Sequence, residues 1–452
     1  MQYERIRRQL LERPMTFYQI LAVGIGVVVN MMDGYDLLSI SFASSAIDRE
    51  WLIGDERIGR LFGIGLFGMA CGAFGLSWIS DVVGRRTGTV VNLVMMSIGM
   101  TIAAFSASFG VLMAARFLTG LGIGAMTASI GSLVFELAPK KRREISLGFV
   151  TAAFPVGTLA GGWIAANVLL DIDWRAVFGF GAVLSVLLIP LVWFLLPESF
   201  DYLLGKQPRN ALERANRQLG KLGLEKLGEL PPKSAVTPTD GTSLLDVLRQ
   251  PVLTSAILAC LGYFGFMTSQ YFILNWMPRI MVQEGFTDAG AIGFGLIRDI
   301  GAIIGCLVVG TVTARLGVRP VTVGLLLILA AAIAAFGTLP LDAVQAIRIS
   351  SFFIGFAAFA TAVGIFSIMA SGYPAHVRAT GIGVAFTAGR LGATAGGYFG
   401  GFFLDVAGLD RAGVCVVLAI PAVIAAVIVG QLAKRNFGAA PPARPIPTEQ
   451  SA

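Results

Sequence analysis

The sequence has little charge and few residues of the kinds that build metal sites or disulfides. Only 13% of the 452 residues are charged and 56% are hydrophobic, whereas a soluble protein carries about 25% charged residues. There is one histidine, and the four cysteines stand singly inside apolar runs, with no metal-ligand or disulfide spacing. These absences exclude an ordinary soluble enzyme, and neither a metal nor a cofactor is expected.

Other missing motifs exclude further classes of protein. No P-loop motif (G-x-x-x-x-G-K-[ST]) occurs, which argues against ATP-driven work. No nucleophile–base pair is visible, so enzymatic activity is not expected. The N-terminus lacks a short apolar segment followed by a small-residue cleavage site, so the first apolar run is expected to stay as an anchor.

Long apolar runs fill most of the chain instead. A run of about 20 apolar residues is long enough to cross the hydrocarbon core as an α-helix. Twelve such runs lie at approximately 17–44, 58–79, 88–108, 111–135, 146–168, 175–196, 252–277, 289–313, 320–340, 347–371, 379–404 and 412–433. They are unbroken, unlike the alternating strands of a membrane barrel. The sequence therefore predicts an all-α polytopic membrane protein with twelve transmembrane helices.

The basic residues indicate how this protein is oriented. They gather in every second connecting segment: Arg5, Arg7, Arg8 and Arg13; Arg85 and Arg86; Lys140–Arg143; 206–249; Arg315 and Arg319; Arg378; Lys434 and Arg435. By the positive-inside rule, both termini are expected in the cytoplasm. The net charge of +7 is thus interpreted as a topology signal, with the lipid bilayer and not nucleic acid as the partner.

One long polar segment divides the chain into two halves. We expect six-helix bundles at 1–200 and 251–435, a cytoplasmic linker at 201–250 and a disordered tail at 436–452. Around 209–227 the linker is expected to form a short amphipathic helix on the bilayer surface.

Short motifs repeat between the halves. Pro139-x-x-x-Arg143 recurs as Pro374-x-x-x-Arg378, and Asp81-Val-Val-Gly84-Arg85-Arg86 has a counterpart at 314–319 at nearly the same offset. Parallel halves related about the membrane normal are typical of secondary transporters, whose binding site lies at the midplane.

Six ionisable residues fall well inside the apolar runs. Each costs roughly 2.5–3.5 kcal/mol at the centre of a membrane helix, so each calls for an explanation. They are Asp33, Asp36, Arg116, Arg298, Asp299 and Arg390.

Asp33 and Asp36 are three residues apart and share one helix face. Two carboxylates close together in a low dielectric repel, so that one is readily protonated. This suits a group that takes a proton from one side of the membrane and releases it to the other. The alternative, that both only bridge neighbouring helices, stays open.

The arginines suit an anionic substrate. A guanidinium at the position of Arg390 can grip a carboxylate with two hydrogen bonds, although a bridge to an acidic side chain is equally compatible with the sequence. Arg298 is a second candidate under the same alternative. Its neighbour Asp299 points about 100° away on the helix, so the two are expected not to pair with each other.

A further group of charges is expected to gate the protein from the cytoplasmic side. These residues would form networks that break and reform as the halves rock. They are Asp81, Arg85, Arg86, Arg116, Glu136, Arg143, Asp299 and Arg378.

The segment Asp81–Arg86 resembles the loop motif of the major facilitator superfamily, although Val82 replaces a basic residue. Asp33-Gly34-Tyr35-Asp36 resembles the Asp-Gly-x-Asp motif of its aromatic acid:proton symporter family. The other stretches similar to that family are Trp51–Gly59, Tyr271–Pro278, Arg378–Gly381 and Gly389–Gly392. Arg298 and Asp299 depart from the family pattern, which is small and glycine-rich there.

The resemblance implies a major facilitator fold and import of an aromatic or related carboxylate together with a proton. Asp33 and Asp36 would handle the proton. The substrate would be bound by Arg390, Arg298, Tyr271, Asn275, Trp276 and Tyr35. A monomer in the bacterial inner membrane is expected. The identity of the acid and the proton stoichiometry stay open, as do a sugar, dicarboxylate or drug substrate and a sensor that binds without transporting.

Overall fold

A computed structural model describes residues 5, 6, 9, 12–139, 142–232, 252–373 and 377–432, with the side chain of Asp81 among the few details left outside. The predicted tail at 436–452 and the end of the predicted linker also lie outside this part. Every regular element in the described residues is helical. The predicted all-α architecture is therefore confirmed.

Within the residues that the structure describes, the first half contains seven helices and a π-helical turn: α2 (Phe17–Trp51), α3 (Gly54–Gly75), α4 (Ser77–Val83), α5 (Arg85–Ala104), α6 (Phe109–Leu137), α7 (Arg143–Ile164), η1 (Ala165–Leu169) and α8 (Trp174–Leu195). The described part of the linker adds the short helices α9 (Phe200–Gly205) and α10 (Ala211–Lys221). The second half contains α13 (Val252–Gln283), α14 (Asp288–Leu316), α15 (Val318–Thr338), α16 (Val344–Gly372), α17 (Arg378–Gly401), η2 (Phe402–Val406) and α18 (Arg411–Leu432).

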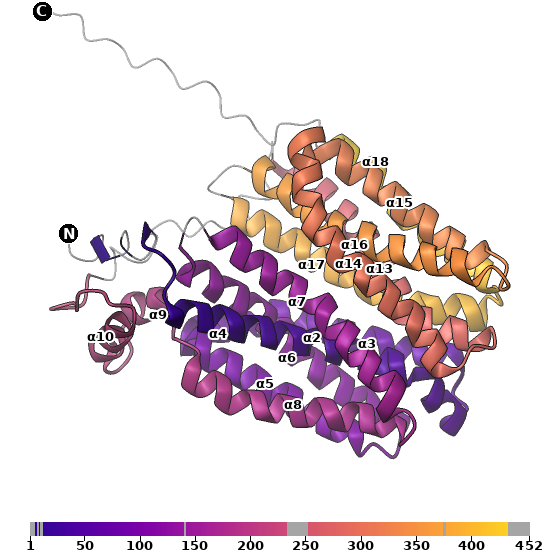
Figure 1. The fold of residues 1–452 in the computed structure, drawn as a ribbon, viewed down its shortest axis with the longest axis horizontal. Helices are drawn as coiled ribbons and strands as arrows, with labels where there is room; N and C mark the ends of the chain where they lie inside the picture. The colour runs from indigo at the N-terminus through magenta and orange to yellow at the C-terminus, as the bar shows by residue number, and fades with distance from the viewer. Residues whose placement is uncertain are drawn as a thin grey trace, which may run out of the picture.

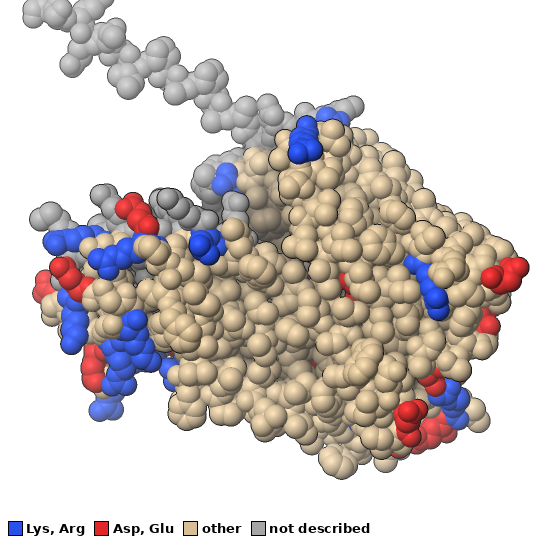
Figure 2. All heavy atoms as spheres, in the orientation of Figure 1, with Lys and Arg blue, Asp and Glu red and all other residues tan. Residues whose placement is uncertain are grey.

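The helix lengths and surface fit a membrane protein. Eleven helices in the described ranges are long and apolar enough to cross a bilayer. The predicted span at 379–404 corresponds to α17, which is not among the eleven, so the count of twelve and the cytoplasmic termini stay predictions. In Figure 2 most visible charged side chains lie at the two ends of the bundle, with a band of uncharged atoms between them. We call the end that carries α9 and α10 the inner end and the opposite end the outer end.

The two halves, side by side in Figure 1, pack their helices in the same order. In the first half α2 packs against α7 and α8, α5 against α6 and α8, and α3 against α6. In the second half α13 packs against α17 and α18, α15 against α16 and α18, and α14 against α16. A π-helical turn follows the fifth spanning position in each half, as η1 and η2. This correspondence confirms the predicted pseudo-symmetry.

Close backbone contacts position the acidic segment of α2. A Cβ on Gly34 would collide with the carbonyl oxygen of Phe154, and one on Gly157 would collide with that of Met31. Glycine at these two places lets α2 and α7 approach backbone to backbone. The glycine between the two aspartates therefore has a packing role.

The predicted linker folds against the inner end of the first half. Its helix α10 is amphipathic, as expected, and buries Ala215 and Leu219 in a small apolar cluster with Leu203 and Leu204 of α9. The buried Glu198 connects this cluster to α5. Its Oε1 accepts hydrogen bonds of 3.1 Å from the backbone N–H groups of two residues, Arg86 in the first turn of α5 and Ser199.

Glu198 replaces a cap that α5 itself lacks, since Gly84 stands at the N-cap with φ of 101° and no side chain. Burial raises the pKa of the Glu198 carboxyl above its ordinary value. Arg214 of α10 lies 3.7 Å from Oε2. The carboxyl thus stabilises α5 and anchors the linker helix.

Glu198→Ala is expected to lower the free energy of unfolding by about 1–3 kcal/mol, because two backbone donors lose their acceptor. Glu198→Gln keeps an acceptor and should lose less. The raised pKa means that the folded protein holds this proton more tightly than the unfolded chain, so the stability that Glu198 contributes falls as pH rises through its pKa. Melting temperatures measured in detergent from about pH 5 to about pH 8 should fall further in wild type than in Glu198→Gln. Parallel curves would contradict this.

Candidate functional site

A buried ion pair lies at the middle of the first half. Nη1 of Arg116, on α6, is 2.9 Å from Oδ1 of Asp36, on α2, and Nη2 donates to the Asp36 carbonyl at 3.0 Å. Ser39 lies 3.3 Å from the same Nη1. The two charged side chains are 3% and 0% exposed, so each needs the other. The prediction that Arg116 belongs to an inner-end network is wrong.

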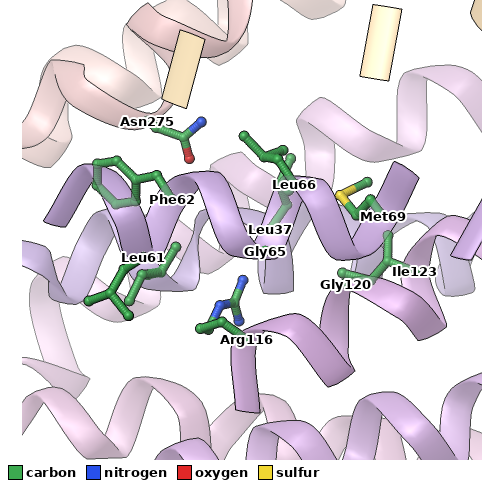
Figure 3. A pocket seen from close by; sticks show the side chains of 11 residues that line it. Leu37, Leu61, Phe62, Gly65, Leu66, Met69, Arg116, Gly120, Ile123 and Asn275 are labelled. Carbon is green, nitrogen blue, oxygen red and sulfur yellow. The ribbon is translucent and has the colours of Figure 1, made fainter. Parts of the chain in front are cut away.

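A small cavity opens beside this ion pair. Its volume in this state is about 10 Å³, which is room for about one water molecule. Its walls are mostly apolar side chains of α2, α3 and α6, including Phe62 and Leu66, with Asn275 of α13 on the opposite side from Arg116 (Figure 3). Nε of Arg116 has no hydrogen-bond partner among the described residues. The cavity is therefore an apolar slot with a polar group on each of two sides, bounded by both halves.

Arg390 lies at the edge of this cavity and interacts electrostatically with Asp33. Asp33 is buried, and within the described residues its Oδ1 has no hydrogen-bond partner. Arg390, on α17, is half-buried and contacts the sulfur of Met69 at 3.9 Å. No acidic side chain in the described ranges forms an ion pair with Arg390, although it attracts the Asp33 carboxylate electrostatically. Met69 also lines the cavity, which brings Arg390 to its edge.

The predicted aromatic residues occupy different places. Tyr35 is buried within the first half, donates to the Val177 carbonyl at 2.5 Å and does not line the cavity. Trp276 is fully buried and packs edge-on against Phe62, a wall residue, with ring centroids 5.1 Å apart. Tyr271 is half-buried, one turn before Asn275, whose amide donates to its carbonyl at 2.7 Å. Of these predicted residues, only Asn275 is part of the cavity wall.

Arg298 and Asp299 pair with each other, contrary to prediction. Nε and Nη2 of Arg298 lie 3.0 and 2.8 Å from Oδ1 of Asp299. The expectation failed because it considered the helix angle alone, whereas a long arginine side chain curls back to its neighbour. Nη1 donates to the Leu274 carbonyl of α13 at 3.1 Å, and Thr158 of α7 donates to Oδ2 at 2.7 Å. Each of the three nitrogens of the Arg298 guanidinium thus donates a hydrogen bond within the protein.

The other predicted gating residues lie near the inner end. Arg85 and Glu136 form an ion pair of 3.0 Å, and Ser199 donates to the same carboxylate at 2.5 Å. The remaining contacts are Arg86 over the ring of Trp193 at 4.9 Å, Arg143 over Phe135 at 4.0 Å, and Arg378 to the Tyr373 carbonyl at 3.3 Å. None of these contacts joins the two halves.

Sequence reasoning missed the polar contacts that join the halves at the outer end. Arg279 of α13 binds Asp48 at 3.0 Å and also Asp55, and is almost fully buried by them. Arg49 pairs with Asp288 at 2.5 Å, so a second bridge crosses the same interface. A signal was available, because Arg279 directly follows the Tyr271–Pro278 motif and both its partners stand in an acidic connecting segment.

Comparisons with known proteins agree with this architecture. The family model described as Major Facilitator Superfamily matches residues 23–397. The 3-(3-hydroxy-phenyl)propionate transporter of Escherichia coli (strain K12) is 26% identical over 85% of this chain and 87% of its own. The benzoate transport protein of Acinetobacter baylyi is 25% identical over 98% and 95%. The predicted resemblance to aromatic acid transporters is confirmed.

Solved structures share the fold. The partially occluded inward-open xylose transporter XylE from E. coli superposes with a TM-score of 0.69 at 17% identity, covering 91% of this chain and 97% of that one. A bacterial homologue of the human lysosomal transporter Spinster, inward-facing and unoccupied, also gives 0.69, at 16% identity over 93% and 98%. The predicted transporter fold is thereby confirmed.

Proposed function

Since this chain belongs to the Major Facilitator Superfamily, we propose that it imports a small aromatic acid or a related carboxylate together with a proton. Its relatives are bacterial transporters, and it is a multi-pass protein of the bacterial inner membrane. Four of the relatives are named for hydroxyphenylpropionate, benzoate, gallate and gentisate. Each of these acids has an aromatic ring with a carboxylate on it or near it. The proposed substrate class takes these two chemical features from them.

Arg390 carries the proposal. It is a half-buried guanidinium at the edge of an apolar cavity, and none of the described acidic side chains pairs with it. A charge held in a membrane without a fixed partner is a functional group by default. A substrate carboxylate would complete it with two hydrogen bonds, and the slot between Phe62 and Leu66 would widen in another state of the transport cycle to take the ring, facing Asn275. Arg298 is left out of the binding role, because it does not line the cavity and each of its guanidinium nitrogens already donates within the protein.

Asp33 links the substrate to a proton in this proposal. Arg390 attracts its carboxylate when the site is empty. A bound substrate anion neutralises Arg390 and adds negative charge nearby, which favours uptake of a proton by Asp33. Substrate and proton then bind together. Asp36, held by Arg116, shapes the site.

The contacts between the halves support alternating access. The bridges made by Arg279 and Arg49 close the outer end, so the site in this state would communicate with the inner end. Rocking the halves would break these bridges and expose the site to the outside. The inner-end charges around Glu136 would hold the first half rigid during this motion.

Uptake into liposomes tests the proposal. We expect labelled benzoate-type acids to accumulate when the outside is made acidic, and a protonophore to abolish the accumulation. Benzamide, which has the ring but no carboxylate, should not compete, and neither should xylose. Uptake that is the same with and without the proton gradient would contradict proton coupling. Competition by benzamide equal to that by benzoate would remove the role of the carboxylate.

A further inference from the structure

The helix α13 is continuous but lacks one backbone hydrogen bond at Pro278, and we call this missing bond the break. Pro278 lies inside α13 and has no N–H, so the carbonyl four residues earlier, that of Leu274, loses its helical donor. Nη1 of Arg298 takes that place at 3.1 Å. Arg298 is 2% exposed, and an unpaired carbonyl at this depth would be unfavourable. Arg298 therefore supplies the hydrogen bond that the proline removes.

Arg298 is in turn connected to the other half of the protein. Asp299 accepts two hydrogen bonds from Arg298 on Oδ1 and one from Thr158 on Oδ2. Thr158 belongs to α7 of the first half and is fully buried. A continuous chain of hydrogen bonds thus runs from α7, through Asp299 and Arg298, to the break in α13.

The Thr158 hydroxyl has two acceptors to choose from. It lies 2.7 Å from Oδ2 of Asp299 and 3.0 Å from the carbonyl of Pro155 in its own helix. A hydroxyl has one proton to donate, so it can turn to Pro155 when the halves move apart. The contact between the halves can therefore be broken without leaving a buried donor unpaired.

The broken segment of α13 forms part of the cavity. Asn275 follows Leu274 directly and lines the cavity, and its carbonyl accepts a hydrogen bond of 2.5 Å from Ser41 of the first half. A shift of the backbone at Leu274 would therefore also move Asn275, whose side-chain amide donates to the Tyr271 carbonyl one turn earlier.

We propose that Arg298 and Asp299 are positioning residues that couple the contact between the halves at Thr158 to the shape of the substrate cavity. They act through the break at Pro278, without touching the substrate. When Thr158 engages Asp299, Arg298 is held against Leu274 and Asn275 faces the cavity. When the halves separate there, this wall loosens. The assignment of the cavity to the substrate rests on the proposed function.

The first test measures the contact between the halves without any substrate. Ser44 is fully buried on α2 beside Arg279 at the outer end, so a cysteine there reports opening of that end. In a Ser44→Cys protein whose four native cysteines are replaced by alanine, Thr158→Val should raise the labelling rate by an impermeant thiol reagent about fivefold. Thr158→Ser, which keeps the hydroxyl, should not. Equal rates in the two variants would overturn the coupling.

The second test addresses the break itself. The Arg298→Met/Asp299→Asn double variant removes both charges together and keeps an acceptor for Thr158. We expect its KM for a benzoate-type acid to rise about tenfold with its maximal rate changed much less. Adding Pro278→Ala returns an N–H to Leu274 and should recover most of the lost affinity. A KM that stays high in the triple variant would overturn the positioning role.

The two tests separate this inference from the proposed function. If wild type carries no aromatic acid, the proposed function fails, and the labelling experiment still decides whether Thr158 controls the contact between the halves. If uptake behaves as proposed and Pro278→Ala gives no recovery, only the positioning role fails.

Discussion

An Asp33→Asn variant is expected to fold as well as wild type and to lose substrate accumulation driven by a proton gradient. Oδ1 of Asp33 has no hydrogen-bond partner in the described part of the chain, so the substitution breaks no hydrogen bond or ion pair there. Asparagine cannot take up the proton that couples to substrate. Exchange of labelled for unlabelled substrate across the membrane, which needs no net proton movement, should persist.

Asp36→Asn is the matched comparison, since it makes the same change three residues away. Here the substitution leaves Arg116 buried without its counter-charge, which costs about 3–5 kcal/mol. We expect a lower melting temperature, and loss of exchange as well as of accumulation. Liposome uptake, exchange and thermal unfolding of the two variants measure this. Equal stability, or gradient-driven accumulation by Asp33→Asn, would remove the distinct roles of the two aspartates.

The different surroundings of Asp33 and Asp36 could not be predicted from the sequence. Spacing correctly indicated that Asp33 and Asp36 share a buried helix face, because periodicity within one helix is a local property. Their partners come from other helices, and Arg116 lies 80 positions further along the chain. Which cation meets which acid depends on how helices pack, and hydropathy does not encode it.

The fold, in contrast, was largely predictable. Hydropathy runs and alternating basic segments depend on the bilayer, which acts on each helix separately. The repeat of Pro139–Arg143 at Pro374–Arg378 indicated the pseudo-symmetry. Contacts between side chains were predicted less well, as the pairing of Arg298 with Asp299 illustrates. There the deciding feature was Pro278, because its missing N–H leaves the Leu274 carbonyl free to accept a hydrogen bond from Arg298. The pattern of charges in the sequence does not indicate this.

Arg390→Met is expected to weaken substrate binding about 100-fold or more, with little loss of stability. Removing one member of a buried charge pair costs 2–5 kcal/mol or more of binding, or roughly 30-fold to several thousand-fold in affinity. The empty protein loses little, because the one hydrogen bond that the Arg390 side chain makes within the described residues goes to the sulfur of Met69, and Arg390 attracts Asp33 at a distance. Arg390→Lys keeps the charge and loses the two-pronged geometry, so its affinity should fall between the two.

Arg60→Met provides the control, since Arg60 is an exposed arginine that pairs with Glu56 in its own helix and such pairs contribute little. Binding of a benzoate-type acid to purified protein, with thermal unfolding measured alongside, separates affinity from folding. Loss of affinity in Arg390→Met at unchanged stability, together with normal behaviour of Arg60→Met, is the expected pattern. Intact affinity in Arg390→Met would mean that the substrate carboxylate binds elsewhere. The next donor to test would then be Nε of Arg116 at the cavity wall, which has no partner among the described residues.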